Sequence, residues 1–191
     1  PGVFGKGVAM EKNIVLIGFM GTGKSTVASR LAARLNRKFV DMDREIERVV
    51  GMTVSDIFKR YGEIRFRSEE KLIAQKLARE SGLVIATGGG VVLEQVNIDT
   101  LSQNGIIICL EATPNELLER VNRKKGTRPL IKKNAQLQDI EEMLKAREAL
   151  YAQADYRVST SGKNPEQVTD EILGIVRKQG DGSFASSPGK G

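Results

Sequence analysis

A glycine-rich loop near the start of the chain constrains its fold and chemistry more than any other feature. Residues 18–26 read Gly-Phe-Met-Gly-Thr-Gly-Lys-Ser-Thr and directly follow the apolar segment 13–17. In such a loop, glycines let consecutive backbone N–H groups turn around phosphate oxygens, Lys24 reaches the β and γ phosphates, and the Ser25 hydroxyl ligates Mg²⁺. The predicted cradle for a nucleoside triphosphate consists of Gly21, Thr22, Gly23, Lys24, Ser25 and Thr26.

The residues after this loop support the prediction. Apolar side chains recur at helical spacing, so the loop is expected to run into a helix whose N-terminal dipole also favours an anion. The alternative is an ordinary strand-to-helix turn that contains Gly-Lys-Ser by chance. The apolar positions are Val27, Ala28, Leu31, Ala32 and Leu35.

Length and composition favour one enzyme-sized domain. The 191 residues are 40% hydrophobic, and we expect a single domain over 10–179 with added or disordered segments at 1–9 and 180–191. No apolar run approaches the length of a membrane span, and Cys109 has no partner for an internal disulfide. A cytoplasmic monomer without membrane contact is therefore expected.

The charge and the lack of histidine narrow the chemistry. The net charge of +6 admits nucleic-acid binding, but basic residues are spread along the chain and only 5% of residues are aromatic. We expect no nucleic-acid partner and favour small anionic ligands. Because histidine is absent, any proton-accepting step falls to a carboxylate, a lysine or water.

Five short apolar segments separated by helical patterns predict an α/β fold with a five-stranded parallel sheet. Thr113 and Asn164 each precede a proline and mark helix starts, while Gly51 and Thr53 end one helix and begin the next. A helical insert that could recognise a substrate is expected at about 43–81. The predicted strands are 13–17, 38–40, 83–86, 105–110 and 156–159.

A basic segment at about 122–134 carries Gly and Pro between two helices and is predicted to form a mobile lid. A cationic flap can exclude water and offset developing phosphoryl charge. A plain solvated loop is the alternative, because loops are often polar.

Asp41 and Asp43 follow the second predicted strand, at the sheet edge where open α/β folds bind ligands. With strand alternation the two side chains would share one side, so that one could hold Mg²⁺ or its water and the other a substrate hydroxyl. The alternative is that Asp43 merely caps the helix that begins at Arg44.

Two further signals point to the same edge. Arg67 lies early in a long helix that starts near Gly62, and Thr87-Gly88-Gly89-Gly90 follows the third strand. Arg67 could pair bidentately with a carboxylate, and the glycines allow close approach of the backbone to a ligand. Each signal also has a simpler explanation. Arg67 could lie on a solvated helix face, and the glycines could form an ordinary turn.

Taken in order, these motifs resemble the shikimate kinase family over about 12–177. The motifs are the phosphate loop, Asp-x-Asp, Phe-Arg before Glu-Glu, Gly-Gly-Gly, Arg-Pro-Leu and Arg147-Glu148-Ala149-Leu150-Tyr151. The resemblance implies a three-layer P-loop kinase fold like that of nucleoside-monophosphate kinases. It also implies transfer of the γ-phosphoryl group of ATP to the 3-hydroxyl of shikimate, in chorismate and aromatic amino acid biosynthesis.

The resemblance also implies roles for individual residues. Lys24, Asp43 and Arg128 would be catalytic, with Asp43 on the attacking hydroxyl and Arg128 brought to the phosphates by the lid. Ser25 and Asp41 would serve Mg²⁺. The implied shikimate-binding residues are Asp43, Arg67, Glu70, Gly88, Gly89, Gly90 and Arg147, and the implied ATP-binding residues outside the loop are Arg120, Arg128 and Lys163.

Other functions remain open from the sequence. A gluconate or nucleoside-monophosphate kinase would keep the phosphate loop and change the acceptor groups, although two arginines and an aspartate suit a carboxylated polyol better. A nucleotide-dependent switch or binding module is disfavoured because no Asp-x-x-Gly follows a strand and no Asn-Lys-x-Asp is present. A nucleic-acid-dependent ATPase would show steep salt dependence of binding.

Overall fold

The central sheet of the computed structural model contains all five predicted strands. The structure describes residues 11–123 and 135–180. All strands are parallel and lie in the order β2-β3-β1-β4-β5. Their bounds are β1 Asn13–Gly18, β2 Lys38–Asp41, β3 Leu83–Ala86, β4 Gly105–Glu111 and β5 Tyr156–Ser159, which confirms the α/β prediction.

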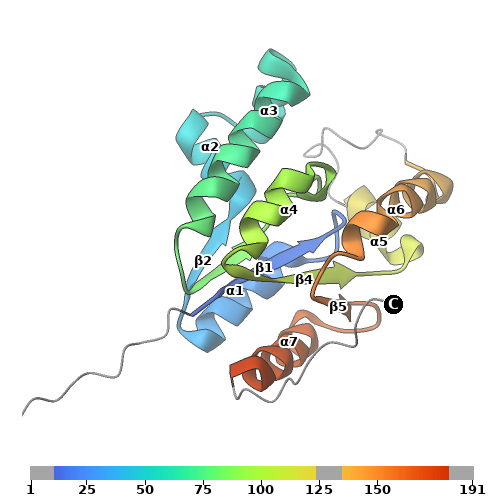
Figure 1. Cartoon of the computed structure of the whole chain (residues 1–191). Coiled ribbons are helices and arrows are strands. Elements are labelled where there is room, and N and C mark those ends of the chain that lie inside the picture. Colours follow the sequence, from blue (N-terminus) through green and yellow to red (C-terminus); the bar gives the residue numbers. More distant parts are fainter. Residues whose placement is uncertain (1–10, 124–134, 181–191) are drawn as a thin grey trace, which may run out of the picture.

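Helices connect the strands and cover both faces of the sheet (Figure 1). A 3₁₀ turn, η1 at Val91–Leu93, lies between β3 and the following helix. The helices are α1 Lys24–Leu35, α2 Met42–Val50, α3 Val54–Ala78, α4 Gln95–Ser102, α5 Pro114–Arg123, α6 Leu137–Tyr151 and α7 Pro165–Gly180.

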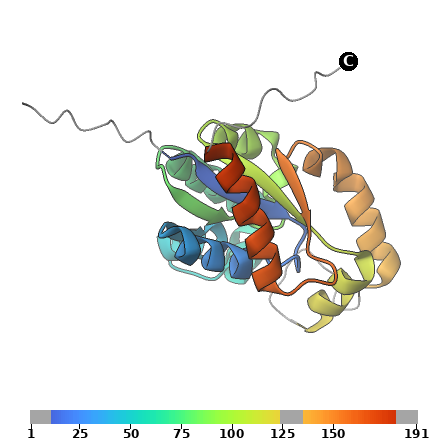
Figure 2. The same ribbon diagram turned by 90° about the horizontal axis from the view of Figure 1, so that it is seen from below.

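The strands are apolar on both faces, which is expected of a parallel sheet between two helical layers. On β1, Val15 and Ile17 belong to a core with side chains of α2 to α6, whereas Ile14 and Leu16 belong to a second core with α1 and α7. Figure 2 shows α7 and α1 on their common face of the sheet. The molecule is therefore a three-layer sandwich.

Turn and cap chemistry sets the helix ends in the insert between β2 and β3. Gly51 ends α2 with a φ of 76°, and the Thr53 hydroxyl accepts a hydrogen bond from the Asp56 backbone N–H at the start of α3. Gly62 interrupts α3 with a φ of 77° and a ψ of 179°. The predicted short helix and long helix are thus both present, and Gly62 forms the kink between them.

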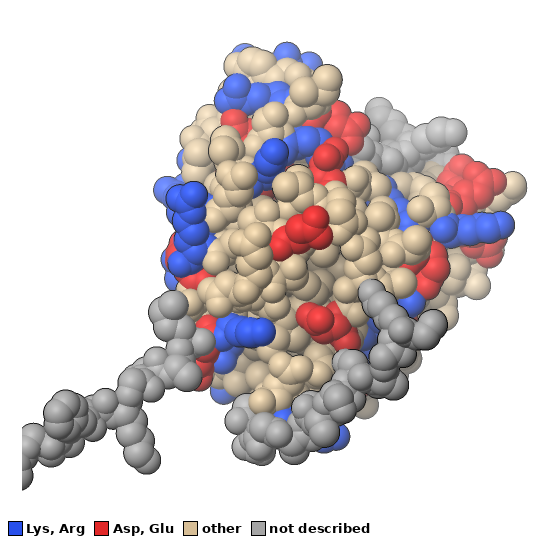
Figure 3. All heavy atoms as spheres, in the orientation of Figure 1, with Lys and Arg blue, Asp and Glu red and all other residues tan. Residues whose placement is uncertain are grey.

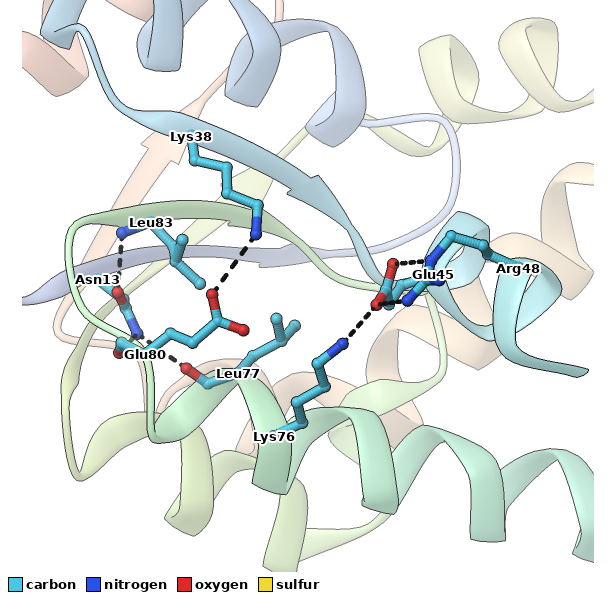
Figure 4. A network of polar contacts seen from close by, with 8 residues as sticks. All are labelled: Asn13, Lys38, Glu45, Arg48, Lys76, Leu77, Glu80 and Leu83. Carbon is cyan, nitrogen blue, oxygen red and sulfur yellow. Dashed lines mark hydrogen bonds and ion pairs between the residues drawn. The ribbon is translucent and has the colours of Figure 1, made fainter.

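A buried asparagine ties the start of β1 to the end of α3 and the start of β3 (Figure 4). The Asn13 amide donates to the carbonyls of Leu77 at 3.2 Å and Glu80 at 2.8 Å, and its oxygen accepts from the Leu83 N–H at 2.9 Å. These three bonds join β1 to the connection between α3 and β3, where the Glu80 carbonyl also accepts from the Asn104 amide and the Leu77 carbonyl from the Glu80 N–H.

Ion pairs on the outside of the insert join α2 to α3. The Glu45 carboxylate accepts hydrogen bonds from Arg48 and from Lys76, both at 2.8 Å (Figure 4). These contacts lower the pKa of Glu45 to about 2. Because the Arg48 and Lys76 side chains are largely exposed, these ion pairs add little to the stability of the fold.

Several sequence expectations concern regions that the structure does not describe. Of the predicted terminal segments 1–9 and 180–191, all residues except Gly180, which ends α7, lie outside the described residues, as does most of the predicted lid, including Arg128. Within the described ranges, no helix is long and apolar enough to cross a membrane. On the face in Figure 3, Lys and Arg are interspersed with Asp and Glu, and the expectation of no nucleic-acid partner remains a prediction.

We predict that Asn13→Ala lowers the free energy of unfolding by about 2 to 4 kcal/mol, because it removes three hydrogen bonds, one of them to the Leu83 N–H, that are each worth roughly 1 kcal/mol. Urea denaturation measures this difference. Asn115→Ala, at an exposed position of α5, is the matched control and should change stability by less than about 0.5 kcal/mol. Equal effects of the two substitutions would contradict the role of the Asn13 amide.

Candidate active site

The glycine-rich loop connects β1 to α1, and hydrogen bonds from its own side chains to its backbone carbonyls hold its conformation. Gly21 and Gly23 have φ values of 86° and 91°, in the left-handed region that favours glycine. The Thr22 hydroxyl donates to the Phe19 carbonyl at 2.8 Å. The buried Lys24 donates its Nζ to the carbonyls of Gly18 at 2.7 Å and Phe19 at 3.0 Å. The loop therefore places its lysine and the N-terminus of α1 together.

Asp41 lies where β2 meets α2 and contacts the loop directly. Its Oδ2 accepts a hydrogen bond from the Ser25 hydroxyl at 2.6 Å, and its Oδ1 accepts from the Arg44 N–H at 3.3 Å. The cap of α2 is thus Asp41, and the alternative that Asp43 caps this helix is wrong. The strand-alternation argument also fails, because β2 ends at Asp41 and α2 begins at Met42.

Asp43 instead lies in the first turn of α2 and faces the glycine run after β3. A Cβ added to Gly88 would lie 2.7 Å from Asp43 Oδ1 and 3.4 Å from Glu70 Oε2. A Cβ on Gly90 would lie 2.5 Å from Arg67 Nη2. The glycines are therefore needed for close approach, and they bring α2, α3 and the end of β3 to one place.

Arg67 is held on α3 by two carboxylates. Its guanidinium donates to Glu70 Oε1 at 2.9 Å and to Glu63 Oε1 at 3.1 Å, and it lies 5.3 Å from the centroid of the Phe66 ring. These contacts fix a planar donor group whose geometry suits a carboxylate ligand.

The buried carboxyl groups of Asp43 and Glu70 have raised pKa values, and each has an oxygen without a hydrogen bond from the described part of the chain. Burial, with the neighbouring Asp41, raises the pKa of Asp43 to about 6, although Lys24 opposes the shift. Burial also raises the pKa of Glu70 to about 7, against the effect of Arg67. Within the described ranges, Asp43 Oδ1 and Glu70 Oε2 are buried and accept no hydrogen bond. Such oxygens are costly unless a ligand, a proton or water satisfies them.

Arg147 reaches the same cluster from α6. Its Nη1 donates to the Gly89 carbonyl at 3.0 Å, and its guanidinium lies 5.5 Å from the centroid of the Phe19 ring. Arg147 is buried. These contacts connect it to both the phosphate loop and the glycine run. The predicted contact of Gly89 with a substrate remains a prediction, because here its carbonyl binds Arg147.

Arg120 and Lys163 lie on the other side of the loop. Arg120 donates to the Gly21 carbonyl at 3.1 Å and to the Thr160 hydroxyl at 3.3 Å. Lys163 pairs with Glu171 on α7. Their assignment to the adenine side of the site remains a prediction.

A single cavity of about 560 Å³ joins the loop to the carboxylate and arginine cluster. Asp41 and Arg147 do not line it, but each is hydrogen-bonded to a residue that does, Asp41 to Ser25 and Arg147 to Gly89. Of the predicted site residues, those that line it are Gly21, Thr22, Gly23, Lys24, Ser25, Thr26, Asp43, Arg67, Glu70, Gly88, Gly89, Gly90, Arg120 and Lys163.

Sequence reasoning missed several lining residues. Phe58 and Phe66 lie on either side of the kink in α3 with ring centroids 4.8 Å apart, and they form an apolar wall. Nothing in the sequence separates these rings from ordinary core side chains. Thr87 and Thr160 also line the cavity, and the rule that ligands bind at the carboxyl ends of parallel strands could have found both.

Comparison with known proteins identifies the family. The family model for shikimate kinases matches residues 20–177. The shikimate kinase of Pelotomaculum thermopropionicum is 48% identical over 167 residues, which cover 87% of this chain and 96% of the relative. That of Persephonella marina is 43% identical over 166 residues, with 87% and 99% covered.

Solved structures agree with this result. The shikimate kinase from Acinetobacter baumannii in complex with shikimate matches with a TM-score of 0.83 and 36% identity, over 88% of this chain and 94% of that one. A gluconokinase from Sinorhizobium meliloti matches with a TM-score of 0.58 and 18% identity, over 91% and 95%. The second likeness shows a shared fold alone and does not favour the gluconate alternative.

The phosphate loop shares its cavity with the arginine and carboxylate cluster, and the relatives match this chain over most of their length. This chain belongs to the shikimate kinase family of ATP-dependent phosphotransferases.

Proposed function

We propose that the protein transfers the γ-phosphoryl group of ATP to the 3-hydroxyl of shikimate, giving shikimate 3-phosphate and ADP. The observation that carries the proposal is one cavity lined both by the phosphate loop and by Asp43 and Arg67. A donor bound at the loop and an acceptor bound at the cluster would share this space. Holding two reactants in line supplies much of the rate enhancement in phosphoryl transfer.

The loop is proposed to bind the phosphates of ATP. Backbone N–H groups at the start of α1 and the positive end of its dipole favour an anion. Lys24, which now donates to the carbonyls of Gly18 and Phe19, would turn its ammonium to the β and γ phosphates. Arg120 and Lys163 are assigned to the adenine side, because both line the cavity beyond the loop.

Ser25 and Asp41 are proposed to serve Mg²⁺. Their oxygens are hydrogen-bonded at 2.6 Å, and hard oxygen donors of this kind suit Mg²⁺, which usually keeps waters and takes phosphate oxygens as ligands. Within the described ranges, no group of three or more His, Cys, Asp or Glu side chains could hold a metal. Bound with ATP, Mg²⁺ neutralises phosphate charge.

The acceptor groups match the chemistry of shikimate, which carries one carboxylate and three hydroxyls. Arg67 and Arg147 are proposed to bind the carboxylate, and Asp43 to accept hydrogen bonds from hydroxyls. Since the pKa of Asp43 is about 6, this carboxyl is largely ionised at neutral pH. It is therefore suited to orient the attacking hydroxyl and to accept its proton as the bond to phosphorus forms.

The remaining assignments concern the arginine of the predicted lid, the cellular compartment and the oligomeric state. Arg128 is proposed to reach the phosphates, although it lies outside the described residues. A cytoplasmic location is proposed because the reaction consumes ATP and the free, buried thiol of Cys109 suits a reducing compartment, and a monomer is proposed as the simplest state.

The first experiment is ADP formation from ATP and Mg²⁺ with shikimate, compared with gluconate and nucleoside monophosphates. We predict that only shikimate stimulates turnover, and that Lys24→Ala lowers kcat by about 100-fold or more because charge stabilisation at the phosphates is lost. Lys145→Ala, at an exposed position of α6, is the control. Stimulation by gluconate instead would move the assignment to another kinase.

Arg147→Ala is predicted to raise the KM for shikimate by roughly 10- to 100-fold, because a charge-assisted hydrogen bond to the carboxylate is lost. The KM for ATP should change little. Initial-rate kinetics with each substrate varied measure both constants. Arg177→Ala, in the last turn of α7, should alter neither, and an unchanged shikimate KM in Arg147→Ala would refute the carboxylate assignment.

Gly90→Ala is predicted to raise the KM for shikimate about 10-fold by pushing the Arg67 guanidinium away from the new methyl group. The φ of Gly90 is −106°, which alanine adopts readily, so the fold should be unaffected. Gly174→Ala in α7 is the matched control, since its Cβ would meet nothing within 4 Å. A lowered melting temperature together with a rise in the KM values for both substrates would instead indicate general damage.

A further inference from the structure

Asn97 is a polar side chain with no solvent exposure that lies behind the acceptor cluster. It belongs to the first part of α4, a helix that packs against α3. Burying an amide is unfavourable unless its hydrogen-bonding groups are used. The position of Asn97 therefore suggests that its amide has a task within the site.

The Asn97 amide is shared between two acceptors. Its Nδ2 lies 3.4 Å from Glu70 Oε1 and 3.4 Å from the Val91 carbonyl. The opposite orientation of the amide would set its oxygen against both of these oxygens, so the chemistry supports the donor assignment. Its Oδ1 is buried and accepts no hydrogen bond from the residues that the structure describes.

Because of this contact, the two carboxylate oxygens of Glu70 have different surroundings. Oε1 receives both Arg67 Nη1, at 2.9 Å, and the Asn97 amide. Oε2 is left facing the space above Gly88, where Asp43 Oδ1 also points. A rotation of the Glu70 carboxyl would release Arg67, and a second donor on Oε1 opposes that rotation.

We propose that Asn97 is a positioning residue for the acceptor site, which holds the Glu70 carboxyl so that Glu70 in turn holds Arg67 in place for the substrate carboxylate. The inference rests on the proposed function, in which Arg67 binds shikimate. The charged groups that act on Glu70 are Arg67, Asp43 and Glu94. Asn97 adds a neutral donor to them, which favours the ionised carboxyl.

The test compares Asn97→Ala, which removes the donor, with Asn97→Asp, which keeps the size of the side chain and places a carboxyl beside Glu70. Both should raise the KM for shikimate roughly 5- to 10-fold while the KM for ATP changes less than about twofold. Both should also raise the pKa of Glu70 above its value of about 7, because a donor to the ionised form is lost.

Carboxyl-carbon NMR of the enzyme with labelled glutamate measures that pKa, and the Glu70 signal is the one missing from Glu70→Gln. Ile98→Val, at the next buried position of α4, is the control for loss of packing and should leave both the pKa and the KM values unchanged. An unaltered Glu70 pKa in Asn97→Asp, or an equal rise in both KM values, would overturn the inference.

The same data separate failure of the inference from failure of the proposed function. If the unsubstituted enzyme forms no ADP in response to shikimate, the proposed function is wrong, whereas the NMR comparison still decides whether Asn97 acts on Glu70. If shikimate is phosphorylated and Arg147→Ala weakens its binding, but the Asn97 variants match Ile98→Val, only the positioning role is wrong.

Discussion

The parallel register of the central sheet is the constraint on which the active site depends. Ala86 at the end of β3 pairs with Leu16 on β1 and with Asp41 on β2. The Thr87 N–H and hydroxyl both donate to the Leu16 carbonyl, at 3.1 and 2.9 Å. These contacts make the phosphate loop, the start of α2 and the glycine run leave the sheet at one edge, where donor and acceptor sites can adjoin.

Charge burial at this edge gives the site its chemistry at the expense of stability. Asp43 and Glu70 have raised pKa values because they are removed from water, and the positive charges of Lys24 and Arg67 partly compensate for that loss. Isolated carboxylates would be unfavourable there. The absence of side chains on Gly88 and Gly90 lets these charged groups approach within a few ångströms of the backbone. The close packing of the Asp43 and Glu70 carboxylates and the Arg67 guanidinium therefore depends on these glycines.

Sequence reasoning succeeded where a residue's role follows from local chemistry. The glycine-rich loop predicted the cradle, and Gly51, Thr53 and Gly62 predicted the helix ends of the insert. The prediction that Asp41 and Asp43 share one side of a strand failed, because the strand ends at Asp41 and the chain continues as a helix from Met42. Sequence reasoning was also silent on Asn97, since a single asparagine in an amphipathic helix gives no sign of the carboxylate it contacts.

By itself, the sequence determined the alternation of strands and helices, the phosphate loop and the residue types of the acceptor site, because periodicity, turn chemistry and motif spacing act over short stretches of chain. The tertiary structure alone decided the strand order and the contacts by which α2, α3 and α6 hold Asp43, Arg67 and Arg147 at one edge of the sheet. It also decided that Asp41 caps α2 and binds Ser25. Those outcomes depend on how distant segments pack, and packing energy is a property of the whole core.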